Sequence, residues 1–311
     1  ECRVAVAGGV NLSIHPKKYL ALAAARMLGS DPYSRSFSQG DGYLPAEAVG
    51  AVLLKPLAAA EADNDRILGV LKATALNHGG QSNGYYVPNG GAQADLIADN
   101  FARAGIDPRT VSYVESAANG AVIGDQIELN ALSAGFARYT GERQFCAIGS
   151  VKSNIGHAEA ASGISQLIKV LLQLQHRQLV PSLLPGVLNT GIDFSATPFR
   201  LQRTLQAWER PTLRLADGSE QSFPLRATVS AFGAGGSNAH LIVEEYVAGA
   251  APASAGHPAE GGDGASQHAQ LVLLSARSAT QLTAMERRLL AVLDTAVPAP
   301  ALADLAYTLH N

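Results

Sequence analysis

The stretch of sequence that decides the fold runs from residue 146 to residue 175 and reads CAIGSVKSNIGHAEAASGISQLIKVLLQLQ. Its first three residues, Cys146-Ala147-Ile148, form a short apolar run that predicts a buried strand. Over 160–175 the apolar residues recur at i, i+3, i+4, i+7 and i+8, which predicts an amphipathic helix. A buried strand followed by such a helix indicates a layered α/β domain.

The flanking sequence repeats this alternation of short apolar runs and helical patterns. The predicted strands are 4–7, 67–74, 111–114, 227–230 and 241–243. The predicted helices are 17–28 and 92–104, and a loop is expected over 78–91. The run 48–54 is short enough to be either a strand or a buried helix. We expect the run 4–7 to be a buried strand that ends at Gly8-Gly9.

A first candidate site lies just before the helix over 160–175, where Lys152, His157 and Glu159 surround Gly156. A histidine at a helix N-terminus can polarise a carbonyl oxygen or transfer a proton. The spacing alone favours a simpler alternative, in which His157 only packs or forms a hydrogen bond in the turn.

A second candidate is the segment 232–240, FGAGGSNAH, between two predicted strands. Three glycines within 233–236 allow backbone N–H groups to point at an oxyanion. The alternative is a plain hairpin turn, with His240 as a core residue. A dinucleotide-binding loop is rejected, because the third glycine is misplaced and a strand follows instead of a helix.

A third candidate covers 114–128 and predicts a strand, a loop of small residues and a helix. Asp125 and Glu128 are expected to be a first-turn or capping pair of that helix. The eight histidines and two cysteines form no metal-binding spacing, and neither a Walker motif nor a G-x-S-x-G motif is present.

The composition restricts the class of protein further. A formal net charge of −3 argues against nucleic acid as the main partner. No apolar run reaches the roughly 18 residues of a membrane span, and the first residues do not resemble a signal peptide. Cys2 and Cys146 cannot build a disulfide framework, which fits a reducing compartment, and we expect a cytoplasmic protein.

The ends of the sequence differ in character from its centre. The run 247–268 is rich in Ala, Gly, Pro and Ser and predicts a flexible linker. A strand over 271–275, a helix over 278–295 and a further helix over 301–309 are expected after it. Because an apolar strand begins at residue 4 and the last helix ends near residue 309, we interpret the chain as a piece of something larger.

Taken in order, these segments resemble a β-ketoacyl synthase, the ketosynthase domain of a modular polyketide synthase. The motifs that carry the resemblance are VAGGVNL (6–12), ARMLGSDPYSRSF (25–37), CAIGSVKSNIGHAEAASG (146–163), IDFSATPFRLQ (192–202) and VSAFGAGGSNAHLIVEE (229–245). DGYLPAEAVGAVLLKPL (41–57) and NHGGQSNGYYVPN (77–89) are most similar to ketosynthases whose acyltransferase acts in trans. The resemblance covers 1–246, and 269–311 is similar to the start of the small linker domain that follows such ketosynthases.

The resemblance implies an α/β fold of the thiolase type, with α/β/α/β/α layers, and a homodimer. It implies a cysteine nucleophile that takes an acyl chain from the phosphopantetheine arm of an acyl carrier protein, with no cofactor bound by the enzyme itself. Two histidines then assist the decarboxylation of a malonyl unit, whose carbanion attacks the thioester. Two N–H donors would stabilise the enolate that forms.

The sequence departs from the family at Ala117, which stands where the first catalytic histidine is expected. Asn119 and Ala121 replace two threonines that contact the pantetheine arm in the family. Losing one donor to an oxyanion costs on the order of 10²–10³ in rate. We therefore expect a non-elongating ketosynthase, which accepts an acyl chain and passes it on. The residues assigned by resemblance to the remaining site are the catalytic His157 and Lys152, and the oxyanion and acyl-site residues Gly233, Ala234, Gly235 and Asn238.

A second departure is that neither Cys2 nor Cys146 lies in the family's nucleophile setting. We expect the cysteine-bearing N-terminal part of the ketosynthase to be the partner that completes this chain. Two alternatives remain at this point: a catalytically silent module that docks a carrier protein or a partner subunit, and a thiolase-fold enzyme that makes a different carbon–carbon bond.

Overall fold

The computed structural model describes residues 2–82, 84, 87–183, 186–215, 217–248 and 272–295, together with Leu305 and Leu309. The chain divides into two compact units, Glu1–Gly249 and Ala250–Asn311, which are described separately. The first unit contains the predicted α/β domain, and the second contains the helix α7 (Ala279–Thr295).

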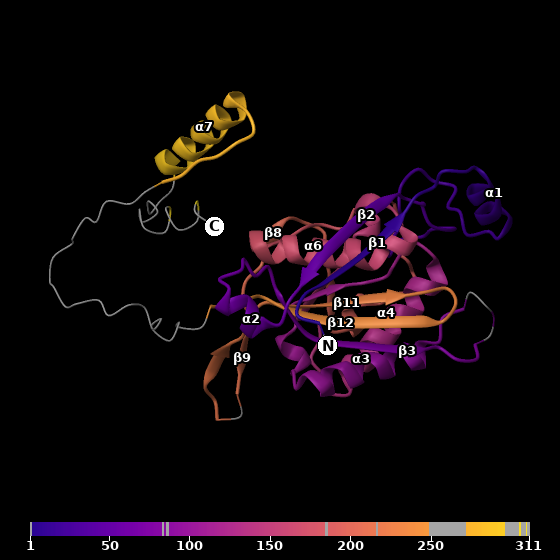
Figure 1. Cartoon of the computed structure of the whole chain (residues 1–311). Helices are drawn as coiled ribbons and strands as arrows, with labels where there is room; N and C mark the ends of the chain where they lie inside the picture. The colour runs from indigo at the N-terminus through magenta and orange to yellow at the C-terminus, as the bar shows by residue number, and fades with distance from the viewer. Residues whose placement is uncertain are drawn as a thin grey trace. The chain divides into compact units, whose positions relative to one another are not determined.

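A mixed six-stranded sheet forms the centre of the first unit (Figure 1). In spatial order its strands are β3 (Val70–His78), β12 (Ser237–Glu244), β11 (Arg226–Phe232), β4 (Tyr113–Glu115), β5 (Cys146–Gly149) and β7 (Phe199–Leu201). The strands β11, β4, β5 and β7 run parallel to one another. The strand β12 is antiparallel to both of its neighbours. The parallel strands therefore all end at one edge of the sheet, where polar loops can meet.

Helices cover both faces of this sheet, as Figure 1 shows. Along β4, Val114 packs in the apolar cluster that contains residues of α3 (Gly90–Ala104) and α4 (Val122–Ala137). Its neighbour Tyr113 packs in a second cluster, with residues of α6 (Ser162–His176). Successive strand residues point to opposite faces, so the two clusters lie on the two sides of the sheet. The helix predicted over 160–175 is α6, and its buried side chains form part of the second cluster.

A two-stranded antiparallel ribbon lies over α6 and is formed by β1 (Ala5–Asn11) and β2 (Ala48–Leu54). The paired glycines Gly9 and Gly50 face the helix. A Cβ on Gly9 would lie 2.9 Å from the carbonyl oxygen of Ala160, and a Cβ on Gly50 would lie 2.8 Å from Ile168 Cδ1. The absence of side chains at this pair lets the ribbon pack directly on α6 and the turn before it.

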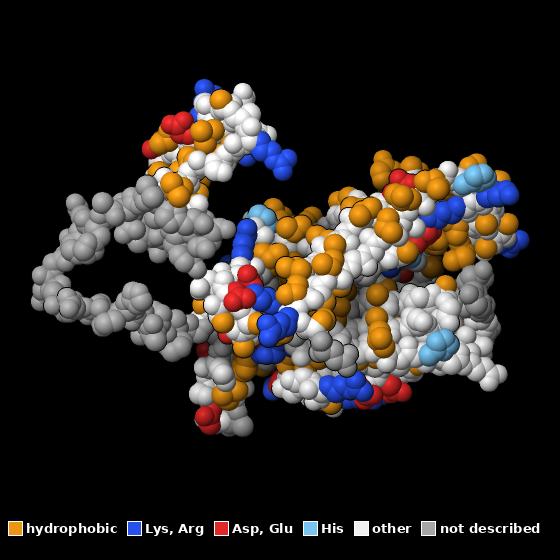
Figure 2. Space-filling model, in the orientation of Figure 1, with side chains coloured by type: hydrophobic (Ala, Val, Ile, Leu, Met, Phe, Trp, Pro, Cys, Tyr) orange, Lys and Arg blue, Asp and Glu red, His pale blue; other side chains and the backbone are white. Residues whose placement is uncertain are grey.

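The strand predicted over 4–7 is present in β1, but it continues through Gly8 and Gly9 to Asn11, and the prediction that it is buried is wrong for the described chain. The outward face of the ribbon is apolar and exposed. Val6, Val49 and Leu53 are 73 %, 75 % and 68 % exposed. The ribbon has α6 on its inner side, whereas no described residue covers its outer side. Figure 2 shows hydrophobic side chains gathered along the ribbon. The run 48–54, which the sequence left open, is a strand.

The other elements are short, and most of the predicted ones are present. They are α1 (Lys17–Ala24), α2 (Leu57–Ala62), α5 (Lys152–Ile155), η1 (Pro108–Thr110), η2 (Glu159–Ala161), η3 (Phe194–Ala196), β6 (Gln178–Leu179), β8 (Gln206–Ala207), β9 (Thr212–Arg214) and β10 (Glu220–Ser222). The strand predicted over 271–275 is not formed by the described residues 272–275. The linker predicted over 247–268 and the helix predicted over 301–309 lie almost wholly outside the described residues.

Substitution of Gly9 by alanine tests how closely the ribbon packs. The new methyl group would press on the backbone oxygen of Ala160, which cannot move without shifting η2. We expect Gly9→Ala to lower the free energy of unfolding by about 1–3 kcal/mol. Gly141→Ala is the control, because no atom lies within 4 Å of a Cβ at that position. Thermal denaturation of the two variants measures the difference, and equal Tm values would contradict this packing.

Candidate active site

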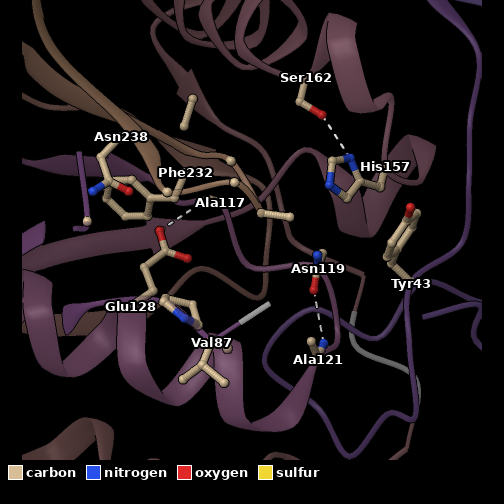
Figure 3. Close-up of a pocket in the computed structure, with 18 of the residues that line it drawn as sticks. Tyr43, Val87, Ala117, Asn119, Ala121, Glu128, His157, Ser162, Phe232 and Asn238 are labelled. Carbon is tan, nitrogen blue, oxygen red and sulfur yellow. Dashed lines mark hydrogen bonds between the residues drawn. The ribbon is translucent and has the colours of Figure 1, made fainter. Parts of the chain in front are cut away.

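A cavity of about 1000 Å³ lies where the parallel strands β4, β5 and β11 end (Figure 3). The loop after β4 contributes Ala117, and the segment after β5 contributes Lys152 and His157. The turn after β11 contributes residues 233–236. The topology thus brings the three sequence segments that carried candidate residues to one site.

The backbone of Ala117 is held rigidly on both sides. Its N–H donates to Glu128 Oε1 at 2.7 Å, and its carbonyl oxygen accepts a hydrogen bond from Lys152 Nζ at 2.5 Å. The next carbonyl, that of Ala118, accepts from the hydroxyls of Ser36 and Ser150 at 2.8 and 2.7 Å. This position is therefore well defined, yet the side chain that it presents to the cavity is a methyl group with no hydrogen-bonding capacity.

Asn119 folds back on the start of helix α4. Its Oδ1 accepts the N–H of Ala121 at 3.0 Å, and its own N–H donates to Asp125 Oδ1 at 2.9 Å. Both Asn119 and Ala121 line the cavity. Among the described residues the side-chain NH₂ of Asn119 has no hydrogen-bond partner. That group is a donor available to a ligand.

Three ionisable side chains near Ala117 are buried, those of Asp125, Glu128 and Lys152. Burial raises the pKa of Glu128 to about 8 and that of Asp125 to about 6, although backbone N–H groups and the Lys152 ammonium favour their charged forms. Burial lowers the pKa of Lys152, against the attraction of Glu128, Asp125 and Glu115. Their hydrogen bonds hold the backbone of the loop after β4. The same three side chains give this wall of the cavity both acidic and basic groups.

His157 has a defined tautomer. Its Nδ1 accepts the N–H of Glu159 at 2.9 Å and lies 2.9 Å from the hydroxyl of Ser162. A neutral ring that accepts at Nδ1 carries its proton on Nε2. Burial, helped by the charges of Lys152 and Lys18, lowers the pKa of this imidazole to about 2. Figure 3 shows Nε2 on the side of the ring away from Ser162, so His157 presents a neutral N–H donor to the cavity.

The turn 233–236 supplies backbone donors. Its own hydrogen bonds run from Gly233 N–H to the carbonyl of Ser237 at 2.8 Å and from Gly236 N–H to the carbonyl of Gly233 at 2.9 Å. The N–H groups of Ala234 and Gly235 have no partner among the described residues. Two adjacent free amides at a cavity wall can bind an oxyanion.

All nine residues that the sequence assigned to the site line this cavity: Ala117, Asn119, Ala121, Lys152, His157, Gly233, Ala234, Gly235 and Asn238. The sequence did not identify Tyr43, whose ring lies 4.7 Å from that of His157, or Gln166. Gln166 Nε2 donates to the carbonyls of Ser116 and Ser230 at 2.8 and 2.9 Å and so ties β4 to β11. Nothing in the sequence distinguishes Gln166 from the other glutamines of the helix predicted over 160–175, so its role could not be predicted.

Neither cysteine belongs to the cavity. Cys146 is completely buried in β5, and burial raises the pKa of its thiol far above the usual range. Cys2 is exposed and does not line the cavity. Within the part of the chain that the structure describes, no group of His, Cys, Asp and Glu side chains could hold a metal ion. In the same residues, no helix has the length and apolar character needed to cross a bilayer.

This fold and this cavity define a member of the β-ketoacyl synthase family, with a thiolase-like fold, and the chain belongs to that family. The family model for the β-ketoacyl synthase C-terminal domain matches residues 68–184. The model for the β-ketoacyl synthase N-terminal domain matches residues 1–60. Within that family, the chain is of the ketosynthase type found in polyketide synthases.

Similar proteins belong to modular assembly lines. The chain is 49 % identical to Polyketide synthase PksL of Bacillus subtilis, over 100 % of this chain and 7 % of that protein. The ketosynthase domain OzmH KS7 of oxazolomycin biosynthesis from Streptomyces albus is 46 % identical, with a TM-score of 0.82 over 99 % of this chain and 51 % of that one. The ketosynthase from module 6 of the Bacillus subtilis bacillaene synthase is 38 % identical, with a TM-score of 0.79. The chain thus spans about half the length of these solved ketosynthases and a small part of the curated relative.

The low pKa of His157 predicts a specific dependence of stability on pH. The folded state keeps the ring neutral to about pH 2, whereas the unfolded chain binds a proton at about pH 6.5. Below pH 6.5 the unfolded state therefore binds more protons than the folded state. As the pH is lowered, His157 makes the free energy of unfolding fall by up to about 1.4 kcal/mol per pH unit. Denaturant unfolding of the protein and of His157→Gln between pH 7 and 4.5 measures this as a difference in slope. The exposed His15→Asn variant is the control, and parallel curves for the protein and His157→Gln would contradict a neutral His157.

Proposed function

We propose that this chain is the C-terminal portion of a non-elongating ketosynthase, which takes an acyl chain from one acyl carrier protein and passes it to another. The proposal divides the chain into the ketosynthase portion 1–246, the linker 247–268 and the start of a post-ketosynthase linker domain in 269–311. The single observation that carries it is the combination in one cavity of an inert side chain at Ala117 with intact donors at His157 and at the turn 233–236.

The transfer step requires a thiolate, which we assign to the N-terminal part of the ketosynthase. The buried thiol of Cys146 cannot serve, because its pKa is raised and it lies outside the cavity. In the step, the thiolate attacks the carbonyl carbon of the acyl-pantetheine thioester, and the oxygen of the tetrahedral intermediate becomes an oxyanion. Collapse of the intermediate expels the pantetheine thiolate, and the reverse steps load the next carrier. The cavity provides free amides at Ala234 and Gly235 for that oxyanion.

Chain extension has a further requirement that this site does not meet. Decarboxylation of a malonyl unit leaves an enolate oxygen, which needs hydrogen-bond donors as its charge develops. His157 supplies one neutral N–H donor, but the methyl group of Ala117 supplies none. Asn119 and Ala121 occupy the positions of the expected pantetheine contacts, and no cofactor beyond the carrier's phosphopantetheine is involved. We therefore assign His157, Lys152, Gly233, Ala234, Gly235 and Asn238 to acyl transfer and to the support of the site.

Acyl transfer without extension is the first outcome to test. The chain, assembled with the N-terminal part of its ketosynthase, is mixed with an acyl-loaded carrier protein and then with a malonyl-loaded one. Intact-protein mass spectrometry should show the acyl mass on the ketosynthase and on an unloaded acceptor carrier, and no extended product. An extended product would contradict the non-elongating assignment. Carrier binding without any acylation would favour a catalytically silent docking module.

The exposed face of the β1–β2 ribbon supports the pairing with the N-terminal part. Full burial of a Val or Leu side chain contributes about 1.5–3 kcal/mol. Val6 pairs with Leu53, and Val49 lies further along the same exposed face of the ribbon. We propose that the N-terminal part covers this face and that the completed ketosynthase is a homodimer.

Leu53→Lys should therefore weaken assembly. Co-purification of the chain with the N-terminal part, followed by thermal denaturation, should show reduced recovery of the complex and a Tm lower by several degrees. Leu205→Lys is the control, since Leu205 is also exposed, at 60 %, but lies outside the ribbon. Equal recovery of the two variants would contradict this interface.

A further inference from the structure

One segment that the acyl-transfer site does not use lies next to it, at the end of strand β3. His78 is the last residue of β3 and pairs with Ser237, the first residue of β12. The turn 233–236 immediately precedes β12, so the ring of His78 lies beside that turn. His78 itself is exposed and does not line the cavity.

The ring of His78 makes two hydrogen bonds that together fix its tautomer. Its Nδ1 accepts the N–H of Gly80 at 3.0 Å, which requires a lone pair on Nδ1. The neutral ring then carries its proton on Nε2, and Nε2 donates to the carbonyl oxygen of Gly235 at 3.0 Å. The side chain thus connects the loop after β3 to the turn before β12.

The hydrogen bond from His78 to Gly235 affects the direction of the Ala234 N–H, because each peptide group in the turn is planar. In a trans peptide the C=O and N–H groups point in opposite directions. The peptide between Gly235 and Gly236 is held at both of these groups, because its N–H donates to the carbonyl of Gly233 at 2.9 Å. That bond in turn holds the peptide between Gly233 and Ala234, whose carbonyl points into the turn. The N–H of Ala234 must then point out of the turn.

The turn is also fixed by packing on the ring. Gly236 has a φ of +94°, and a Cβ at this position would lie 2.8 Å from Cε1 of His78. The N–H of Gly79 donates to the carbonyl of Gly236 at 2.7 Å. Asn89, which caps helix α3, donates to the carbonyl of Gly79 at 2.6 Å. The turn is therefore connected to α3 through Gly79, the residue that follows His78.

We propose that His78 is a positioning residue, which orients the turn 233–236 so that the amide N–H of Ala234 is preset for the thioester oxygen of an acyl group. The proposal rests on the proposed function in that it names what the oriented amide binds. The bonds of His78 and the order of the turn can be measured independently of any transfer.

Two substitutions separate the two bonds of the ring. An asparagine places its Oδ1 near the position of Nδ1, so His78→Asn keeps an acceptor for Gly80 and loses the donor to Gly235. A glutamine reaches the position of Nε2, so His78→Gln keeps the donor to Gly235 and loses the acceptor for Gly80. His15→Asn is the matched control. His15 Nδ1 also accepts the N–H two residues on, at 3.1 Å from Lys17 N, but lies outside the cavity.

The assembled ketosynthase is assayed with an acyl-loaded carrier protein, and hydrogen–deuterium exchange is followed in peptides that span 232–238. His78→Asn should lower the rate constant of acylation about 10- to 100-fold, less than the loss of a whole oxyanion donor, with KM for the carrier unchanged. It should also speed exchange in the turn. His78→Gln should restore most of both properties, and His15→Asn should change neither.

Equal loss in His78→Asn and His78→Gln, or a loss of rate without faster exchange in the turn, would overturn the positioning role. If the unsubstituted protein shows no acyl transfer, the proposed function fails. The exchange measurement then still decides the role of His78, because unchanged exchange in His78→Asn would refute it.

Discussion

The carboxylate of Glu115 is the interaction on which the arrangement of this site depends. It is completely buried at the end of β4, and Lys169 of α6 lies 2.8 Å from its Oε2. Its Oε1 accepts the N–H of Val151 at 2.5 Å, and the hydroxyl of Tyr113 donates to Oε2 at 2.7 Å. One side chain thereby connects the end of β4, the segment after β5 and the helix on the opposite face of the sheet from α4. Removal of one partner from such a buried pair leaves an uncompensated charge, which costs about 3–5 kcal/mol.

The positions of Ala117 and Lys152 at the cavity follow from this connection. Val151 immediately precedes Lys152, and Glu115 lies two residues before Ala117, so the carboxylate sets the distance between the two segments. Lys152 can then donate to the carbonyl of Ala117, and α4 supplies Glu128 to the N–H of the same residue. The loop after β4 is therefore held by hydrogen bonds to buried ionisable side chains and not by the side chain that it presents. This explains how a methyl group can occupy position 117 without loosening the surrounding backbone.

Much of this organisation could be predicted from the sequence, because its signals are local. The apolar spacing over 160–175 predicted a helix that is found at Ser162–His176, and the nine assigned site residues line one cavity. Gln166 and Tyr43 could not be predicted, since their roles depend on partners more than 40 residues away in the sequence. The strand predicted over 4–7 is present in β1, but the expectation that it is buried failed for a related reason. Apolar character predicts that a surface is covered, but it does not say that the cover lies within the described residues. The strand predicted over 271–275 is not formed by residues 272–275, because that prediction rested on apolar residues alone.

In the proposed function, the methyl group of Ala117 permits acyl transfer and prevents chain extension. In thioester exchange and in decarboxylation alike, an oxygen gains negative charge and needs hydrogen-bond donors. The turn 233–236 carries its donors on the backbone, so only substitution by proline would remove one, whereas a donor at position 117 depends on the side chain. A catalytically silent scaffold would need neither a preset turn nor a histidine held neutral with its donor toward the cavity. The ordered turn 233–236 and the neutral His157 beside Ala117 therefore favour the proposed loss of chain extension alone over loss of all activity.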